Sequence, residues 1–389
     1  MRSKLSALKR RTISRSRRLL NFDQALTKRS LSLGPAWFHQ INTVNRRLLR
    51  HPFVNSLQNG RAKNGGTRLK LEYTWKIALS TLAGEWAHRT HKEAEDLAAL
   101  ESLFAYNIDQ QGDWLTPIDR VAYAMKGYSL LYLAQVTAEK RYCRAVNQLA
   151  EKLLSSHPRA ADGSLPYDTN TEAILVDSLA MICPFLARYG QQYRHSEAME
   201  VSANQLEQFV ARCVDPDTKL PYHGYFAGGP TRLGLQGWGR GTGWYMLGLI
   251  DTLSEMSQAQ ASYAELLRAY VSAANSVRTF QREDGHWSWV VLHRKDTPDS
   301  STTSLIGYSI FRGMQLGILD RSFRDVIATA LQALVGQTRP DGIVDGSLAE
   351  CRGLGKYPQQ YEPTLWLQGA TTAFAALYFG EKNTESNVL

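Results

Sequence analysis

The chain has 389 residues, of which 43% are hydrophobic and 10% aromatic, enough to bury a large core in one or two domains. No apolar run reaches the roughly 18 residues that a membrane-spanning helix requires. The four cysteines lack the spacing of a zinc site or of a disulfide framework. We therefore expect a cytoplasmic protein with reduced thiols.

The net charge of +9 comes from the N-terminal segment. Residues 1–70 contain 17 Lys and Arg side chains and one acid, Asp23, so the remainder of the chain is net acidic. The segment lacks the apolar stretch of a secretory signal. We predict a basic, partly disordered extension over residues 1–65 and one globular domain over residues 66–389. The extension could contact an anionic membrane or an acidic polysaccharide, or be a solvated tail; it has too few aromatic residues to favour nucleic acid.

From about residue 71 the pattern predicts a succession of helices in which apolar segments alternate with more charged ones. The apolar segments begin near residues 72, 119, 177, 241, 302 and 364. Because these segments are rich in Gly, Ala and Ser, they can pack closely inside, with the charged helices facing water. Six such pairs close into a ring, so we predict an all-α (α/α)6 barrel in which residues 35–50 supply the sixth outer helix. The best strand candidate is Trp287 to Leu292.

In such a ring, the loops that precede the inner helices meet at one mouth. Polar and aromatic residues gather at these positions: Trp114 and Asp119, Tyr167 to Glu172 with Asp177, Tyr222 and His223, Trp238 to Trp244, Trp287 and Trp289, Asp299 to Thr303, and Tyr361 with Trp366. Their convergence predicts a binding cleft.

The most distinctive segment runs from Gln236 to Met256 and opens with WGRGTGW. Trp238 and Trp244 offer flat apolar faces on which sugar rings can stack. Arg240 offers a planar fork that suits a carboxylate. Together they suggest an acidic sugar as ligand; the alternative is a loop with buried core tryptophans and a surface arginine.

Asp177 lies in an otherwise apolar helix, where a carboxylate must be paired, hydrogen-bonded or protonated. Burial favours the protonated form, which suits a general acid, although an Asp that caps a loop or pairs with an Arg would look the same. Asp119 follows Pro117 and could be a first-turn acid stabilised by the helix dipole. His223 could donate to a substrate hydroxyl or be a structural histidine.

Three segments resemble the unsaturated uronyl hydrolases of glycoside hydrolase families 88 and 105. They are Asp119 to Gly190, the WGRGTGW run, and DSSTTSLIGYSIFRGMQLGIL at residues 299–319, and the collinear match spans about residues 70–380. The resemblance implies an (α/α)6 barrel and a hydrolase that releases a 4,5-unsaturated uronic acid from the non-reducing end of oligosaccharides. A carboxylic acid protonates the ring double bond at C4, water adds at C5, and the resulting hemiketal opens with loss of the glycosidic bond.

The resemblance also assigns roles to residues of this chain, and it implies neither a metal nor an organic cofactor. Asp177 falls on the general acid/base, and Asp119 on a second carboxylate that positions the substrate or the water. The implied substrate-binding residues are His223, Trp238, Arg240, Thr242 and Trp244.

Three departures from the family pattern keep an alternative function open. Residues 162–175 (DGSLPYDTNTEAIL) lack a His that the family often has, and Thr242 stands where Asn is common. The basic extension over residues 1–70 is not typical of the family. The alternative is a non-catalytic or altered-activity carbohydrate-binding protein of capsule or exopolysaccharide biosynthesis.

Overall fold

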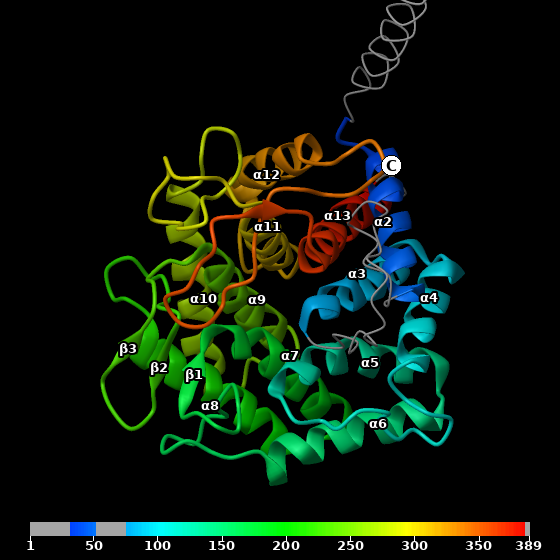
Figure 1. Cartoon of the computed structure of the whole chain (residues 1–389), viewed down its shortest axis with the longest axis vertical. Coiled ribbons are helices and arrows are strands. Elements are labelled where there is room, and N and C mark those ends of the chain that lie inside the picture. Colours follow the sequence, from blue (N-terminus) through cyan, green and yellow to red (C-terminus); the bar gives the residue numbers. More distant parts are fainter. Residues whose placement is uncertain (1–31, 52–74, 386–389) are drawn as a thin grey trace, which may run out of the picture.

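The computed structural model describes residues 32–51 and 75–385, which fold into a ring of helices around a common centre (Figure 1). The inner helices are α3 (Trp75–His91), α5 (Ala124–Thr137), α7 (Val176–Tyr193), α9 (Gly239–Leu253), α11 (Ser300–Gln315) and α13 (Leu365–Glu385). The outer helices are α2 (Pro35–Arg50), α4 (Ala94–Ala105), α6 (Lys140–Glu151), α8 (Ser196–Cys213), α10 (Tyr263–Thr279) and α12 (Arg324–Gly336). Each inner helix contacts the next, and α13 contacts α3, which closes the ring. The predicted all-α (α/α)6 barrel is confirmed.

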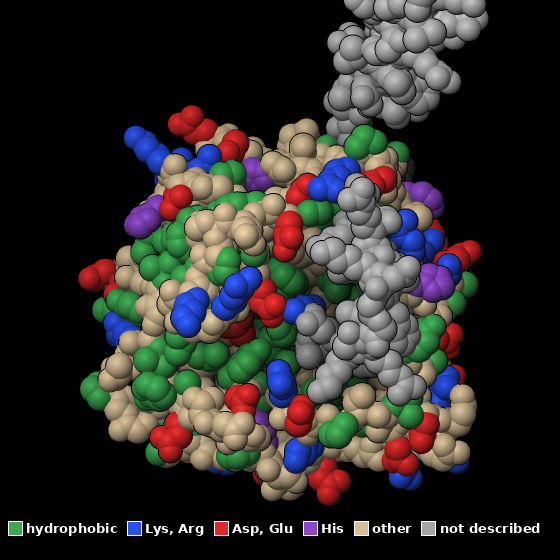
Figure 2. Space-filling view, viewed as in Figure 1, with side chains coloured by type: hydrophobic (Ala, Val, Ile, Leu, Met, Phe, Trp, Pro, Cys, Tyr) green, Lys and Arg blue, Asp and Glu red, His purple; other side chains and the backbone are tan. Residues whose placement is uncertain are grey.

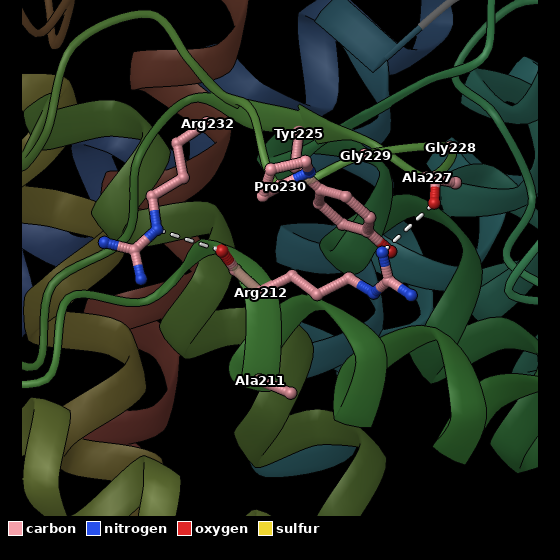
Figure 3. A pocket seen from close by; sticks show the side chains of 8 residues that line it. All are labelled: Ala211, Arg212, Tyr225, Ala227, Gly228, Gly229, Pro230 and Arg232. Atoms are coloured by element: carbon pink, nitrogen blue, oxygen red, sulfur yellow. Dashed lines mark hydrogen bonds between the residues drawn. The ribbon is translucent and has the colours of Figure 1, made fainter.

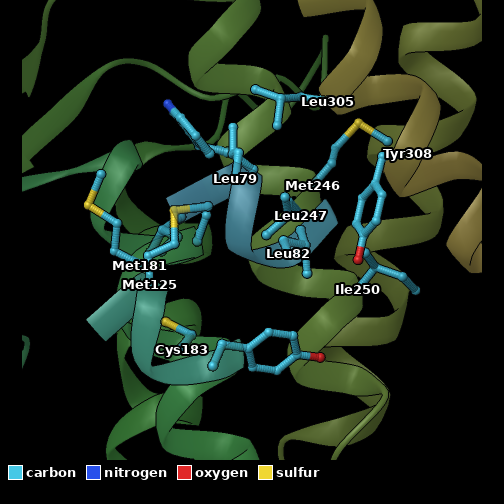
Figure 4. Packing of buried hydrophobic residues seen from close by; sticks show 14 of the residues in the cluster. Leu79, Leu82, Met125, Met181, Cys183, Met246, Leu247, Ile250, Leu305 and Tyr308 are labelled. Carbon is cyan, nitrogen blue, oxygen red and sulfur yellow. The ribbon is translucent and has the colours of Figure 1, made fainter. Parts of the chain in front are cut away.

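The alternation of apolar and charged segments has the predicted physical meaning. Every residue of α5 from Ala124 to Ala134 is buried, because this helix touches neighbours on all sides. The outer helix α6 buries one stripe, which includes Tyr142, Val146 and Leu149, and leaves the opposite face to solvent. Apolar side chains from the inner helices fill the centre of the ring (Figure 4).

Small residues allow the inner helices to touch through their backbones. A Cβ added at Gly369 of α13 would lie 2.4 Å from the carbonyl carbon of Leu79 and 2.4 Å from the amide nitrogen of Ser80, both in α3. No larger side chain fits between these two helices without separating them. The closure of the ring between the first and last inner helices therefore depends on a glycine.

Residues 35–50 form α2 and pack against α13, α3 and α4, as predicted for the sixth outer helix. They belong to the barrel in space although they fall inside the predicted extension. Most other residues of that extension, and with them the predicted membrane or polysaccharide contact, lie outside the described residues. Among the helices that the structure describes, none combines the length and the apolar character that a membrane span requires.

Short strands cluster at the N-terminal ends of the inner helices. β1 (Ala173–Leu175), β2 (Gly224–Phe226) and β3 (Arg232–Leu233) form an antiparallel sheet, and β4 (Ser347–Leu348) pairs with β5 (Tyr361–Glu362). Single helical turns lie at η1 (Val121–Tyr123), η2 (Lys152–Ser156) and η3 (Arg321–Phe323). The segment that joins β4 to β5, residues 349–360, runs across this face of the ring (Figure 1), and we call it the β4–β5 loop.

The predicted strand from Trp287 to Leu292 is wrong. This stretch forms only isolated bridges, one from Ser288 to Pro298 and one from Val290 to Trp238. Its apolar run reflects burial within a loop, because Trp287 and Val291 are both fully buried without belonging to a sheet.

Candidate active site

Asp177 lies in the first turn of α7, two residues after the end of β1, at the mouth of the ring. Its side chain is 18% exposed, and its Oδ2 atom is buried with no hydrogen-bond partner among the described residues. A carboxylate oxygen without a partner is costly to keep buried, unless it is protonated or meets a ligand. This cost sets Asp177 apart from an ordinary capping residue.

His223 lies beside Asp177. Its Nε2 lies 3.4 Å from Asp177 Oδ2, within ion-pair distance although the contact falls short of hydrogen-bond geometry. The imidazole is 2% exposed and stacks against Trp238, with ring centroids 4.5 Å apart. The structure therefore brings together two residues that the sequence assigned to the site from separate motifs.

Asp177 interacts electrostatically with three weakly acidic side chains, those of Tyr167, Cys351 and Tyr357. Burial raises the pKa of Tyr167 well above its ordinary value, and the nearby Asp177 charge raises it further. Burial likewise raises the pKa of the Cys351 thiol, and it raises the pKa of Tyr357 to about 12, with Asp177 contributing in both cases. All three groups keep their protons at neutral pH, so they face Asp177 as neutral groups.

The two tryptophans of the WGRGTGW run are buried, at 2% exposure for Trp238 and 0% for Trp244. Trp238 contacts both His223 and Tyr357, which also contact each other, and Trp244 packs edge-on against Trp75 at a centroid distance of 6.2 Å. Their indole faces are thus covered by protein. Their part in binding a sugar stays a prediction.

Unpaired polar atoms mark the same helix start. The indole Nε1 atoms of Trp238 and Trp244 and the hydroxyl of Thr242 are all buried without a hydrogen-bond partner within the described chain. Native proteins rarely leave such groups unsatisfied, and those that remain often serve a ligand or an ordered water. The start of α9 therefore holds two donors and one hydroxyl that no described protein group satisfies.

Arg240 is 1% exposed, and its guanidinium donates to the carbonyl oxygens of Leu348 at 2.9 Å and Ala349 at 3.1 Å. It also lies over the ring of Trp238, 5.0 Å from the centroid. Its role as a carboxylate clamp stays a prediction. In this structure it anchors the start of the β4–β5 loop, which is also tied to α3 by an ion pair of 2.8 Å between Lys76 and Glu350.

Asp119 lies in an exposed loop two residues before η1, not inside the inner helix as expected. No hydrogen bond or ion pair joins it to Asp177 in the part of the chain that the structure describes. Burial raises the pKa of Tyr167, and the charge of the next residue, Arg120, opposes this rise. The second-carboxylate role of Asp119 stays a prediction.

The face that carries these residues is hollowed, with hydrophobic side chains inside and acidic and basic side chains along its edge (Figure 2). A separate pocket of about 850 Å³ lies beside the β2–β3 hairpin and contains none of the predicted site residues (Figure 3). Its two arginines are occupied within the protein: Arg212 donates to the Ala227 carbonyl, and Arg232 donates to the Arg212 carbonyl. We place the candidate site at the mouth because the unpaired Asp177 oxygen and His223 lie there.

Sequence reasoning missed Tyr357. Its hydroxyl lies 2.8 Å from His223 Nδ1, across 134 residues of sequence. It stands in the β4–β5 loop without a helical or strand pattern around it, so no signal in the sequence points to it. Cys351, in the same loop, was missed for the same reason.

Comparison with known proteins supports the superfamily that the sequence resembles. The model of Glycosyl Hydrolase Family 88 matches residues 49–376. The unsaturated rhamnogalacturonyl hydrolase YesR of Bacillus subtilis is 26% identical over 198 residues, which cover 49% of this chain and 56% of that protein. The chain therefore spans about half the length of this curated relative.

Solved structures share the fold. A candidate member of family GH105 from Klebsiella pneumoniae superposes with a TM-score of 0.79 at 16% identity, covering 90% of this chain and 95% of that one. The unsaturated glucuronyl hydrolase of Bacillus sp. GL1 gives a TM-score of 0.64 at 16% identity, covering 88% of this chain and 95% of that one. At these identities the likeness establishes the barrel and leaves the substrate to be argued from the site.

Proposed function

The chain belongs to glycosyl hydrolase family 88, and from this premise we propose that it hydrolyses oligosaccharides that carry a 4,5-unsaturated uronic acid at the non-reducing end. The relative from Bacillus subtilis carries the name of an unsaturated rhamnogalacturonyl hydrolase, which supports this substrate class. The observation that carries the proposal is the buried, unpartnered Oδ2 of Asp177 at the mouth of the barrel, 3.4 Å from His223 Nε2.

Asp177 is the proposed general acid and base. The reaction needs one group that gives a proton to C4 of the ring and then accepts a proton from the water that adds at C5. One oxygen of this carboxyl group is buried, and its neighbours Tyr167, Tyr357 and Cys351 remain neutral, so these three groups add no charge of their own beside it. The C5 hemiketal then opens, and the sugar at C1 leaves.

The start of α9 is the proposed binding region for the acidic sugar. The buried Nε1 donors of Trp238 and Trp244 and the hydroxyl of Thr242 have no partner among the described residues, so a substrate carboxylate or hydroxyl would satisfy them. Arg240 contributes positive charge nearby while it holds the β4–β5 loop. Asp119, on the exposed loop before η1, would position the substrate or the water.

The test is loss of the ultraviolet absorbance of the C4=C5 double bond when the protein is incubated with di- and oligosaccharides produced by polysaccharide lyases. We expect wild type to bleach at least one such substrate, and Asp177→Asn to be slower by about 10²–10⁴-fold, as is typical for a lost general acid and base. The matched control is Asp325→Asn, which changes an exposed first-turn Asp of the outer helix α12.

Two results would overturn the proposal. One is a folded Asp177→Asn protein that turns over at the rate of wild type and of Asp325→Asn. The other is a folded wild-type protein that bleaches no member of a broad panel of unsaturated uronates, which would favour a binding role for the same barrel.

The expected cytoplasmic location stays a prediction.

A further inference from the structure

Tyr357 connects three segments that are distant in sequence. Its hydroxyl oxygen accepts a hydrogen bond of 3.2 Å from the backbone N–H of Leu235, just before α9, and lies 2.8 Å from His223 Nδ1. Gly234 makes this approach possible: with φ +71°, it presents no side chain, and a Cβ there would lie 2.6 Å from His223 Cβ and 3.2 Å from the Tyr357 hydroxyl. The contact is therefore closely packed.

The hydrogen-bonding capacity of a phenol favours one direction for the contact, because only donation to Nδ1 uses the phenol proton. A tyrosine hydroxyl has one proton to donate and two lone pairs. The Leu235 N–H occupies one lone pair, and burial raises the pKa of Tyr357 to about 12, so the hydroxyl keeps its proton. Donation of that proton to Nδ1 satisfies both groups, and it requires that the neutral imidazole carry its own proton on Nε2.

We propose that Tyr357 is a positioning residue that fixes His223 in its Nε2–H tautomer, so that His223 presents a donor to Asp177. Nε2 is the nitrogen that faces Asp177 Oδ2, at 3.4 Å. In the opposite tautomer, two unprotonated acceptors would face each other whenever Asp177 is ionised, which is unfavourable in a buried site. Contacts of this kind often tighten only when the substrate binds.

The catalytic meaning of this inference rests on the proposed function, whereas the tautomer itself does not. A donor on Oδ2 would hold the Asp177 carboxyl in one orientation and leave the other oxygen, Oδ1, to exchange the proton with the substrate. In this role Tyr357 would act on Asp177 through His223. Removal of the Tyr357 hydroxyl should therefore lower kcat more than it changes KM.

The test reads the tautomer directly in the full chain without substrate, by ¹⁵N–¹H correlation spectra of protein labelled at its histidines. His223→Gln identifies the signal of His223, and mildly alkaline buffer keeps free imidazole neutral. We expect the Nε2–H pattern in wild type and a shift toward the Nδ1–H pattern in Tyr357→Phe. Tyr270→Phe is the matched control: it also removes a buried hydroxyl, one that donates to the Ser309 carbonyl, away from His223.

The outcomes separate the two proposals. An Nδ1–H pattern in wild type, or a pattern unchanged in folded Tyr357→Phe, overturns the positioning role whatever the activity; the wild-type spectrum decides the first point even if the variant fails to fold. If wild type bleaches unsaturated uronates, Tyr357→Phe should lower kcat roughly 3- to 10-fold with KM little changed, the effect of one neutral hydrogen bond. A wild-type protein with the Nε2–H pattern and no bleaching would instead contradict the proposed function alone.

Discussion

The backbone N–H of Val176 donates a hydrogen bond of 2.8 Å to the carbonyl oxygen of His223. This bond extends the pairing of β1 with β2 by one residue pair, Val176 with His223. Asp177 is the next residue along the chain. The pairing of the two main chains therefore brings residues 177 and 223 to neighbouring positions. A side-chain substitution at position 223 should remove the donor and leave the position of Asp177 unchanged.

His223→Ala should fold normally and lose about 10- to 100-fold in the rate of uronate bleaching. A hydrogen bond to a charged group is worth about 1.5–3 kcal/mol, and Ala removes the ring N–H that we propose would donate to Asp177 once the substrate is bound. His223→Gln keeps an N–H donor of similar reach and should recover part of the rate. Steady-state kinetics of both variants, beside His293→Ala at an exposed position, provide the check. Equal rates for His223→Ala and His293→Ala would contradict the assigned role of His223.

Gly369→Ala should destabilise the barrel, because the added methyl group would meet the α3 backbone at 2.4 Å. Overpacking of this kind costs about 1–3 kcal/mol, and backbone cannot move aside as a side chain can. Gly336→Ala, at the end of the outer helix α12, meets nothing within 4 Å and should be neutral or slightly stabilising. Chemical denaturation of the two variants measures the difference. Equal stability would mean that the ring closes without the close approach of α3 and α13.

The barrel could be predicted from the sequence because the burial of a helix restricts its amino-acid composition. A helix such as α5, buried over most of its length, must be apolar and rich in small residues, and an outer helix such as α6 must be amphipathic. The position of Asp177 was equally predictable, since a lone acid in an apolar helix stands out. His223, Trp238 and Arg240 were predicted from local motifs, and the structure places them near one another.

The contacts that define the site could not be predicted in the same way. Whether the face of Trp238 is open or covered depends on Tyr357, which approaches from a loop without any periodic pattern. The partners of Arg240 are backbone carbonyls, and every residue type supplies those equally. Tertiary contacts made through loops and backbone groups leave no pattern in a single sequence, which is also why the buried run at Trp287 to Leu292 was mistaken for a strand.

Arg240→Lys should lower the free energy of unfolding by about 1–3 kcal/mol, even though the charge is kept. The guanidinium donates through two separate nitrogens to the carbonyls of Leu348 and Ala349, and a lysine ammonium cannot reproduce that fork. Denaturant unfolding measures the loss, with Arg324→Lys on the exposed surface of α12 as the control. A loss no larger than that of the control would show that the anchor on the β4–β5 loop contributes little.

A buried polar network lies near the C-terminal ends of the inner helices, at the far end of each helix from the site. The Arg188 guanidinium bonds both Glu85 and Glu255, at 2.8 and 2.9 Å. Beside it, the Tyr308 hydroxyl donates to Asp251 at 3.0 Å, and Arg312 approaches Asp251 at 3.7 Å. Asp251 is fully buried, and this burial raises its pKa from 3.8 to about 7, with the Arg312 charge opposing the shift.

The raised pKa of Asp251 predicts a stability that falls as the pH rises. The folded protein binds a proton at Asp251 that the unfolded chain releases near pH 4, so the contribution is complete below about pH 4 and is lost as the pH approaches 7. A shift of about three pKa units corresponds to at most about 4 kcal/mol. Arg312, Arg188 and Glu85 all face Asp251 and share in the measured slope.

Asp251→Asn keeps an acceptor for Tyr308 and removes the titration, so its free energy of unfolding should change less with pH between about 4 and 7 than that of wild type. Asp325→Asn, at an exposed position in the first turn of α12, should show the same change of unfolding free energy with pH as wild type. Urea unfolding at a series of pH values measures all three proteins. Because other groups titrate over the same range, the test compares the pH dependence of the unfolding free energy of wild type with that of Asp251→Asn. Parallel curves for these two proteins would show that Asp251 does not change its protonation on folding.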